Sequence, residues 1–149
     1  MGNVSVLTIA WLLLLSMSWE VISAGSDCTI QTNGCSVPLG LKAPYQTILT
    51  PACVKHDVCY YCGELYRWNQ EQCDKAFKRD MYKLCERKGK RWFIGDLLTK
   101  EKRCKSLGAD AYYTAVRIAG HLHWEKNSPP WCQKACAKDL GDPNILIRH

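Results

Sequence analysis

The chain has 149 residues, 47% of them hydrophobic, and its 20 Lys and Arg against 14 Asp and Glu give a formal net charge of +6. This length is enough for one small domain, and we take one domain as the working assumption. The positive charge suits an anionic partner, but no nucleic-acid-binding motif is present, so we expect no nucleic-acid partner.

The first 24 residues are predicted to be a secretory signal peptide. An apolar run, VSVLTIAWLLLLSMSW, precedes the small residues of VISAGS, and cleavage is expected near Ala24 or Gly25. The run is too short and too early for a membrane span. We therefore expect a secreted protein whose mature part, residues 25–149, is one domain.

All ten cysteines follow the predicted signal peptide. An even number of cysteines in an exported chain favours five disulfides. A domain of this size buries only about two-thirds of its unfolded surface, so cross-links would add to its stability.

The first regular element is predicted in the middle of the chain. Residues 27–50 indicate a loop, because Asn-Gly, Pro and Gly recur there. Thr50 followed by Pro51 is typical of a helix start, with an N-cap and then proline at the first helical position. We expect this helix to run from Pro51 to about Tyr66.

Two further helices follow. The second is predicted from Asn69 to Gly89, because Asn69 and Gln72 have the spacing of a capping box and glycine often ends a helix. The third is predicted over ADAYYTAVRIAG, residues 109–120. Its expected apolar face contains Tyr112, Ala115, Val116 and Ala119.

The end of the chain adds little regular structure. The segment EKNSPPW interrupts regular secondary structure. Cys132 and Cys136 indicate a short turn or helix that disulfides link to the rest of the domain. No internal repeat and no long alternating strand pattern is present. The predicted fold class is all-α and disulfide-rich.

Basic residues concentrate in the second predicted helix and just beyond it. Eight of them lie in KAFKRDMYKLCERKGKR, residues 75–91. Such a stripe either meets anionic lipid head groups or is a solvated helix face.

The stretch PACVKHDVCYYCG, residues 51–63, contains Cys, His and Asp at close spacing. A zinc cluster is one reading. Each step of three residues turns a helical side chain by about 300°, so the four Cys and His side chains would fan out and could not converge on one ion. Oxidising surroundings also favour disulfides, so we discard the zinc reading.

A catalytic reading rests on His56 and Asp74. In the second helix Asp74 falls in one arc with apolar residues, namely Phe77, Met81, Leu84 and Cys85. A buried carboxylate needs a partner, and an imidazole from the adjacent antiparallel helix fits. The alternatives are a merely packed histidine and a carboxylate in a helix first turn. Asp80 lies outside this arc and is expected to be solvated.

Such a pair would form an oriented base. A disulfide between Cys59 and Cys73 would bring His56 and Asp74 close, and the second ring nitrogen of the histidine would then take a proton from water. Asp57 points about 100° away from His56, which leaves it free to bind a hard cation together with loop carbonyls.

The strings ACVKHDVCYYCG and CDKAFKRDMYKLC, followed by AYYTAVRIAG, resemble the secreted, calcium-dependent phospholipases A2. The similarity is greatest to the branch shared by bacterial and fungal enzymes and the conodipines of cone snail venom. It covers roughly residues 32–120. The first two strings form a specific pair, whereas either alone would be weak.

The resemblance implies two long antiparallel, disulfide-linked helices, a third helix and a calcium-binding loop. It implies that His56 is the general base, Asp74 its orienting carboxylate and Asp57 a Ca²⁺ ligand. The backbone carbonyls of Asn33 and Gly34 would be further ligands. The family often has Asp where Asn33 stands, but a backbone ligand is indifferent to that change.

The family pattern also implies a partial disulfide pairing. The implied bonds are Cys35–Cys53, Cys59–Cys73 and Cys85–Cys104. The other four cysteines, Cys28, Cys62, Cys132 and Cys136, stay unassigned.

The implied activity is hydrolysis of the sn-2 ester of glycerophospholipids at a membrane surface, expected to be anionic, with venom as one expected setting. The alternative is a non-enzymatic, phospholipase-like toxin or ligand that binds a receptor or channel. The complete set of His56, Asp57 and Asp74 argues against that alternative. The oligomeric state stays open.

Two other features have two readings each. Four tryptophans, Trp68, Trp92, Trp124 and Trp131, either form a collar at a lipid interface or pack in the core. The basic strings KGKR (88–91) and KEKR (100–103) either mark processing sites or are solvated. Processing there would excise WFIGDLLTKEKR and leave two chains joined by Cys85–Cys104.

Overall fold

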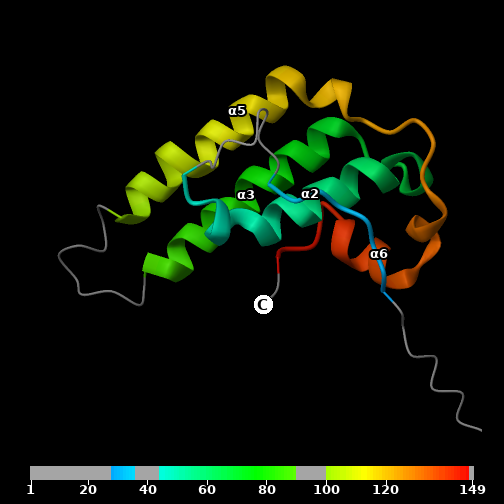
Figure 1. Cartoon of the computed structure of the whole chain (residues 1–149), viewed down its shortest axis with the longest axis horizontal. Helices are drawn as coiled ribbons and strands as arrows, with labels where there is room; N and C mark the ends of the chain where they lie inside the picture. Colours follow the sequence, from blue (N-terminus) through cyan, green and yellow to red (C-terminus); the bar gives the residue numbers. More distant parts are fainter. Residues whose placement is uncertain (1–27, 36–43, 90–99, 148–149) are drawn as a thin grey trace, which may run out of the picture.

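The computed structural model describes residues 28–35, 44–89 and 100–147, and these ranges contain helices and loops but no strand. Two long helices, α2 (Gln46–Tyr66) and α3 (Gln70–Gly89), lie side by side and are joined by a three-residue turn, so they run antiparallel (Figure 1). The expected all-α architecture is confirmed. Within the described ranges no helix has the length and apolar character needed to cross a bilayer.

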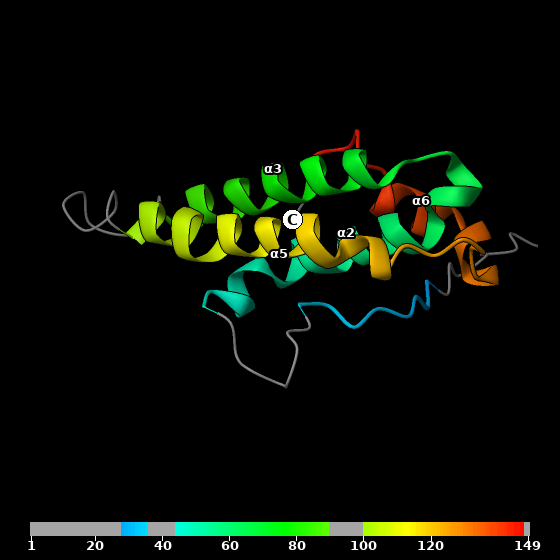
Figure 2. The same cartoon turned by 90° about the horizontal axis from the view of Figure 1, so that it is seen from above.

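The remaining elements pack on this pair of helices. The continuous segment η2 (Cys104–Ala109), α5 (Asp110–Ala119) and η3 (Gly120–Leu122) lies along α2 and α3, as the view from above shows (Figure 2). The short helices η4 (Pro130–Gln133) and α6 (Ala135–Gly141) pack against α2. The predicted signal peptide and the whole segment between the two basic strings, residues 92–99 with Trp92, lie outside the described residues.

Helix α2 begins earlier than the sequence predicts. It starts at Gln46, so Pro51 lies inside the helix and not at its first position. Proline has no N–H, and the carbonyl of Thr47 therefore loses its usual partner. Thr47 is exposed and water can reach it, while the Thr50 hydroxyl donates to the Gln46 carbonyl at 2.8 Å. The proline is tolerated because this turn of the helix faces solvent.

Helix α3 begins as predicted. The Gln72 backbone N–H donates to Asn69 Oδ1 at 2.9 Å, and the Asn69 N–H donates to Gln72 Oε1 at 2.9 Å. These reciprocal bonds are the predicted capping box, and each satisfies a backbone donor that the helix itself leaves unpaired. The helix also ends at Gly89, as expected.

The third predicted helix is present, but its apolar face is narrower than expected. Tyr112 and Val116 pack against the core, together with Tyr113. Ala115 and Ala119 are exposed. Periodicity identified the helix, and the packing of α3 determines which of its residues are covered.

Five disulfides join the described elements, and no described cysteine is free. The three bonds implied by the family pattern, Cys35–Cys53, Cys59–Cys73 and Cys85–Cys104, are present. The unassigned cysteines form Cys28–Cys136 and Cys62–Cys132. The last two bonds tie α6 and η4 to the start of the described chain and to α2.

The hydrophobic core lies between α2, α3 and the η2–α5 segment. Leu49 and Met81 are completely buried there, and Phe77 and Leu84 are nearly so. A second cluster around Val58 fixes α6 to the opposite side of α2. Helix α2 is therefore covered on two sides, which explains why its own sequence lacks a single apolar face.

The structure corrects the expectation that Asp80 is solvated, because this residue is only 1% exposed. Lys55 Nζ donates to Asp80 Oδ2 at 2.7 Å and also to the Ile145 carbonyl, and Arg79 Nη2 lies 2.9 Å from Asp80 Oδ1. The C-terminal segment carrying Ile145 and Ile147 closes over this ion pair. The periodicity of apolar residues within α3 cannot show that the C-terminal segment, which is distant in sequence, buries Asp80.

We expect Lys55→Met to lower the free energy of unfolding by about 3 to 5 kcal/mol, because it leaves the Asp80 carboxylate buried without its closest cation. Denaturant unfolding with the disulfides intact measures this change. Lys83→Met is the matched control, since the exposed Lys83–Glu86 pair contributes at most about 1 kcal/mol. Equal effects of the two substitutions would contradict a structural role for the buried pair.

Candidate active site

A pocket of about 400 Å³ opens between α2, the η2–α5–η3 segment and the loop around Cys35. Its walls are largely apolar and come from Phe77, Tyr112, Val116 and Leu122. His56 and Asp57 supply polar groups next to each other. A concave, mostly apolar site with a few convergent polar groups is typical of a small-molecule or lipid site.

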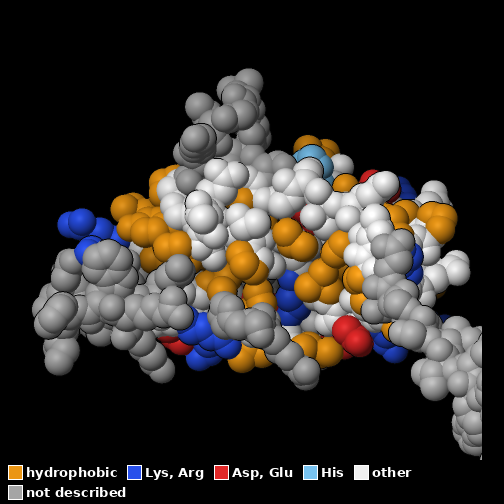
Figure 3. All heavy atoms as spheres, turned by 60° about the horizontal axis from the view of Figure 1, so that its bottom comes forward, with side chains coloured by type: hydrophobic (Ala, Val, Ile, Leu, Met, Phe, Trp, Pro, Cys, Tyr) orange, Lys and Arg blue, Asp and Glu red, His pale blue; other side chains and the backbone are white. Residues whose placement is uncertain are grey.

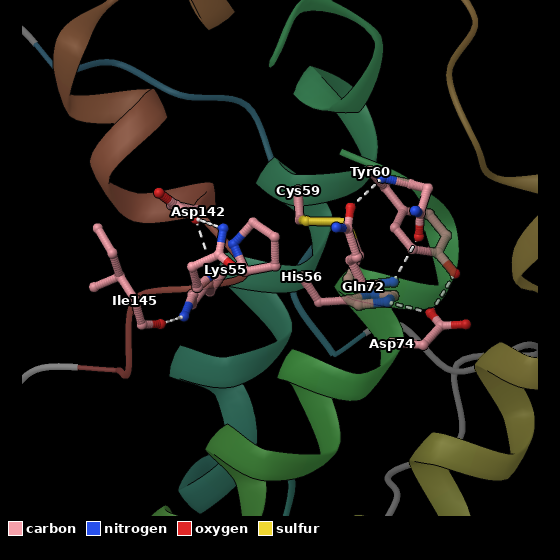
Figure 4. Close-up of a disulfide and its surroundings, with 12 residues drawn as sticks. Lys55, His56, Cys59, Tyr60, Gln72, Asp74, Asp142 and Ile145 are labelled. Atoms are coloured by element: carbon pink, nitrogen blue, oxygen red, sulfur yellow. Dashed lines mark hydrogen bonds and ion pairs between the residues drawn. A yellow bond between two sulfur atoms is a disulfide. The ribbon is translucent and has the colours of Figure 1, made fainter. Parts of the chain in front are cut away.

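His56 lies in the middle of α2, and its side chain is only 7% exposed. Its Nε2 atom lies 3.0 Å from Asp74 Oδ1, so the predicted meeting of the two side chains is confirmed (Figure 4). The imidazole stacks on Phe77 and tilts against Tyr60, with ring centroids 4.5 and 4.1 Å apart. These contacts hold the ring in one orientation, with Nδ1 as the nitrogen that does not face Asp74.

Burial lowers the pKa of His56, although the hydrogen bond with Asp74 acts in the opposite direction. The imidazole is therefore neutral at physiological pH and can accept a proton. A general base needs this protonation state.

Asp74 has no exposed surface. Its Oδ1 atom accepts the hydrogen bond from His56 and another from the Tyr60 hydroxyl at 2.6 Å, and its Oδ2 atom accepts from Arg117 Nη1 at 3.1 Å. Burial alone would raise the pKa of this carboxyl group, but the donors His56, Tyr60 and Arg117 outweigh it and hold the pKa below its ordinary value. Asp74 is therefore an ionised carboxylate.

The Cys59–Cys73 disulfide lies directly beside this pair (Figure 4). Cys59 is one turn beyond His56 in α2, and Cys73 immediately precedes Asp74 in α3. The bond fixes the register of the two helices at the point where the side chains meet.

Asp57 faces the loop that precedes α2. Its Oδ2 atom accepts hydrogen bonds from the backbone N–H groups of Gly34 at 2.8 Å and Asn33 at 3.2 Å. Gly34 has a φ of 61°, a left-handed conformation that glycine adopts without strain. The predicted metal ligands Asp57, Asn33 and Gly34 therefore lie together on one side of the pocket.

Burial raises the pKa of Asp57 to about 6, and the two loop N–H groups only partly offset this effect. Among the described residues no Lys or Arg forms an ion pair with this carboxylate, so a bound cation would compensate a partly buried charge. A carboxylate beside a loop whose backbone carries carbonyl oxygens offers the kind of ligand that a hard cation prefers. Among the described residues there is no cluster of three or more His, Cys, Asp or Glu that would suit another kind of metal site.

The loop orientation differs from the one implied for a calcium site. The peptide group between Asn33 and Gly34 turns its N–H toward Asp57, and its carbonyl oxygen therefore points away. Asp57, Asn33 and Gly34 are residues of the type that binds Ca²⁺, and they lie close together. Ligation by the Asn33 carbonyl would require this peptide group to rotate.

Sequence reasoning missed two partners of Asp74. Tyr60 lies four residues after His56, so helical spacing placed it on the same face and could have identified it. Arg117 lies in α5 and carries no local signal that connects it to Asp74. Only the packing of α5 on α3 brings it there.

The described tryptophans pack inside the protein. Trp124 lies against Gly63 and Tyr60, and Trp131 contacts Tyr61 edge-on. Trp68 contacts Tyr66 with ring centroids 4.8 Å apart. All three are partly buried, which favours the core-packing reading over a lipid collar for these residues.

The fold and the site together define an all-helical, disulfide-linked protein with a buried histidine–aspartate pair whose histidine lines a pocket. The chain belongs to the family described as prokaryotic phospholipase A2, whose profile matches residues 18–120. The resemblance seen in the two cysteine-containing strings is confirmed.

Curated relatives come from cone snails. Conodipine-P3 from Conus purpurascens is 45% identical over 76 residues, which make up 50% of this chain and 42% of the relative. Conodipine-M alpha chain from Conus magus is 47% identical over 63 residues, which make up 42% of this chain and 80% of the relative. The chain thus spans less than half the length of the longer relative. No solved structure matches the chain significantly.

We expect Tyr60→Phe to destabilise the protein by about 1.5 to 3 kcal/mol at neutral pH, because it removes a hydrogen bond to a buried carboxylate. A lowered carboxyl pKa stabilises the fold above the unfolded value of about 3.9, and this stabilisation is lost as the pH falls through the folded value. In Tyr60→Phe the pKa of Asp74 rises toward the unfolded value, so this pH-dependent stabilisation should be smaller and should be fully lost at a higher pH.

Denaturant unfolding at a series of pH values and carboxyl-carbon NMR of Asp74 test this prediction. Tyr82→Phe is the control, because it removes a similar tyrosine bond, to Asp110, at a more exposed position. An unchanged Asp74 titration in Tyr60→Phe would contradict the assigned role of the hydroxyl.

Proposed function

We propose that this protein is a secreted, calcium-dependent phospholipase A2 that hydrolyses the sn-2 ester of glycerophospholipids. The contact of 3.0 Å between the ionised Asp74 and His56, which lines a largely apolar pocket, carries this proposal. Family membership and the five disulfides support the activity and export, respectively. The similarity to conodipines supports a role as a venom component.

In the proposed mechanism His56 is the general base. Its Nδ1 accepts a proton from water as the water oxygen attacks the carbonyl carbon of the ester. Asp74 stabilises the imidazolium that forms and keeps the ring oriented. His56 then gives the proton to the departing alkoxide as the acyl–oxygen bond breaks, and the products are a fatty acid and a lysophospholipid.

The remaining residues serve binding. Asp57 and the backbone of Asn33 and Gly34 would hold Ca²⁺, which when bound supplies positive charge for the substrate phosphate and for the developing oxyanion. Phe77, Tyr112 and Val116 line the pocket and would contact the acyl chain.

The outer face of α5 suits contact with a lipid surface. Its large exposed side chain is Ile118, and Leu107 of η2 and Leu122 of η3 extend this face at the two ends of the helix. Their exposures are 71%, 57% and 72%, respectively. The residues between them on this face are small, namely Ala111, Thr114 and Ala115, and all three are exposed. Leu122 also lines the pocket, so this apolar face is continuous with the pocket entrance. We propose that it rests on the membrane from which the substrate comes.

The basic stripe of α3 contributes less free charge than its sequence indicates. Lys75 pairs with Glu71, Lys78 with Asp110 and Lys83 with Glu86. These pairs favour the reading of a solvated helix face. Preference for anionic lipid and excision of the segment between the basic strings both remain predictions.

We expect the wild-type protein to release fatty acid from the sn-2 position of phosphatidylcholine with Ca²⁺ and to lose this activity with a chelator. His56→Gln should lower the rate by about 10² to 10⁴ without unfolding the protein, because it removes the base and keeps a polar side chain of similar size. Product analysis by mass spectrometry and thermal unfolding provide the two readouts. Asp57→Asn should recover part of its activity at high Ca²⁺.

Absence of hydrolysis by the wild-type protein at any Ca²⁺ concentration would favour the alternative of a non-enzymatic toxin or ligand. Activity in a chelator would instead contradict the role of Asp57.

We expect Leu107→Ser with Ile118→Ser to weaken binding to phosphatidylcholine vesicles by about tenfold or more, since each side chain contributes on the order of 1 kcal/mol when it leaves water. Co-sedimentation in a His56→Gln background measures binding without hydrolysis. Leu146→Ser is the control. This leucine is 40% exposed and belongs to the C-terminal segment. Figure 3, which brings the bottom of Figure 1 forward, shows a face on which hydrophobic side chains are interspersed with Lys and Arg. Equal losses in both proteins would rule out α5 as the contact face.

A further inference from the structure

Arg117 connects the third helix to the histidine–aspartate pair. It lies in α5, and its Nη1 atom donates to Asp74 Oδ2 at 3.1 Å. The other carboxylate oxygen, Oδ1, accepts from His56 Nε2 and from the Tyr60 hydroxyl. The two oxygens of Asp74 thus have separate partners, and Arg117 holds the one that faces away from the histidine.

We propose that Arg117 is a positioning residue of the active site, which fixes the rotation of the Asp74 carboxylate so that Oδ1 faces His56 Nε2. The expected effect of Arg117 on kcat rests on the proposed function. Its effect on the orientation of the Asp74 carboxylate does not. Arg117 itself does not line the pocket and does not touch the reacting atoms.

Side-chain mechanics support this role. The terminal torsion of an aspartate is broad, so one oxygen held by two donors does not by itself fix the plane of the carboxylate. A charged donor on the second oxygen restrains it, because charge-assisted hydrogen bonds are shorter and roughly twice as strong as neutral ones. Phe77 and Tyr60 already hold the imidazole in place. Arg117 in turn restrains the Asp74 carboxylate.

The burial of its partner distinguishes Arg117 from an ordinary surface ion pair. Lys78 and Asp110 also link α3 to α5, at 3.0 Å, but both of these side chains are about 40% exposed. The Arg117 side chain is 44% exposed, whereas Asp74 is fully buried. Water therefore cannot take the place of the guanidinium at Oδ2 as readily as it can at an exposed carboxylate.

Arg117 is also not needed to hold α5 in place. The Cys85–Cys104 disulfide anchors the beginning of this segment to α3. Phe77 and Tyr112 pack edge to face across the same two helices, with centroids 6.5 Å apart. The contact with Asp74 is thus available for orienting the carboxylate rather than for docking the helix.

The decisive comparison is between Arg117→Gln and Lys78→Gln. Both remove one cation that links α5 to α3, but only Arg117 touches Asp74. We expect Arg117→Gln to lower kcat about tenfold with KM changed less than twofold, by analogy with the loss of about tenfold or more on removing groups that orient a metal-bound imidazole. Lys78→Gln should stay within twofold of wild type, and Arg117→Lys, which keeps the charge and one donor, should recover most of the loss.

A second readout does not depend on turnover. The proton on His56 Nε2 that bonds to Asp74 should give a downfield NMR resonance in wild type and in Lys78→Gln. In Arg117→Gln this resonance should shift upfield or broaden. Thermal unfolding identifies any variant that fails to fold, in which case Arg117→Lys and its resonance carry the test.

The outcomes separate the two proposals. A wild-type protein that hydrolyses no lipid refutes the proposed function, while the resonance still decides whether Arg117 positions Asp74. Equal kinetic losses in Arg117→Gln and Lys78→Gln, or an unchanged resonance in Arg117→Gln, would overturn the positioning role.

Discussion

The carboxylate of Asp74 is completely buried, and such a group is stable only when its oxygens accept hydrogen bonds. The donors come from α2 through His56 and Tyr60 and from α5 through Arg117. Three helices therefore pack around one negative charge, and the same packing forms the walls of the pocket. The site and the core share the same residues, so a substitution that disturbs the Asp74 charge affects both the stability of the fold and the geometry of the site.

Adjacent residues of α2 serve opposite sides of the molecule. Lys55 points toward Ile145 and His56 points toward Asp74 (Figure 4). Lys55 binds Asp80, which lies six residues after Asp74 in α3. One ion pair, Lys55–Asp80, and one hydrogen bond, His56–Asp74, therefore fix the register of the two helices. One of them is part of the proposed chemistry, and the other holds the C-terminal segment.

Local patterns predicted the helices and the meeting of His56 with Asp74, because an acid within an apolar arc of one helix requires a partner on its neighbour. The capping box at Asn69 was equally visible, since it involves residues close in sequence. Asp80 and Arg117 could not be placed in this way. The cover over Asp80 comes from the C-terminal segment, 65 or more residues away, and Arg117 reaches Asp74 across 43 residues.

The disulfides also determine what happens to the covalent chain if it is opened between Gly89 and Lys100. Two bonds, Cys35–Cys53 and Cys59–Cys73, lie wholly before this point, whereas Cys28–Cys136, Cys62–Cys132 and Cys85–Cys104 cross it. A nick there would release no fragment, and Arg117 would stay attached to the half that contains Asp74 through three sulfur bridges. Reassembly of a nicked and fully reduced protein would instead be a bimolecular reaction whose yield depends on concentration.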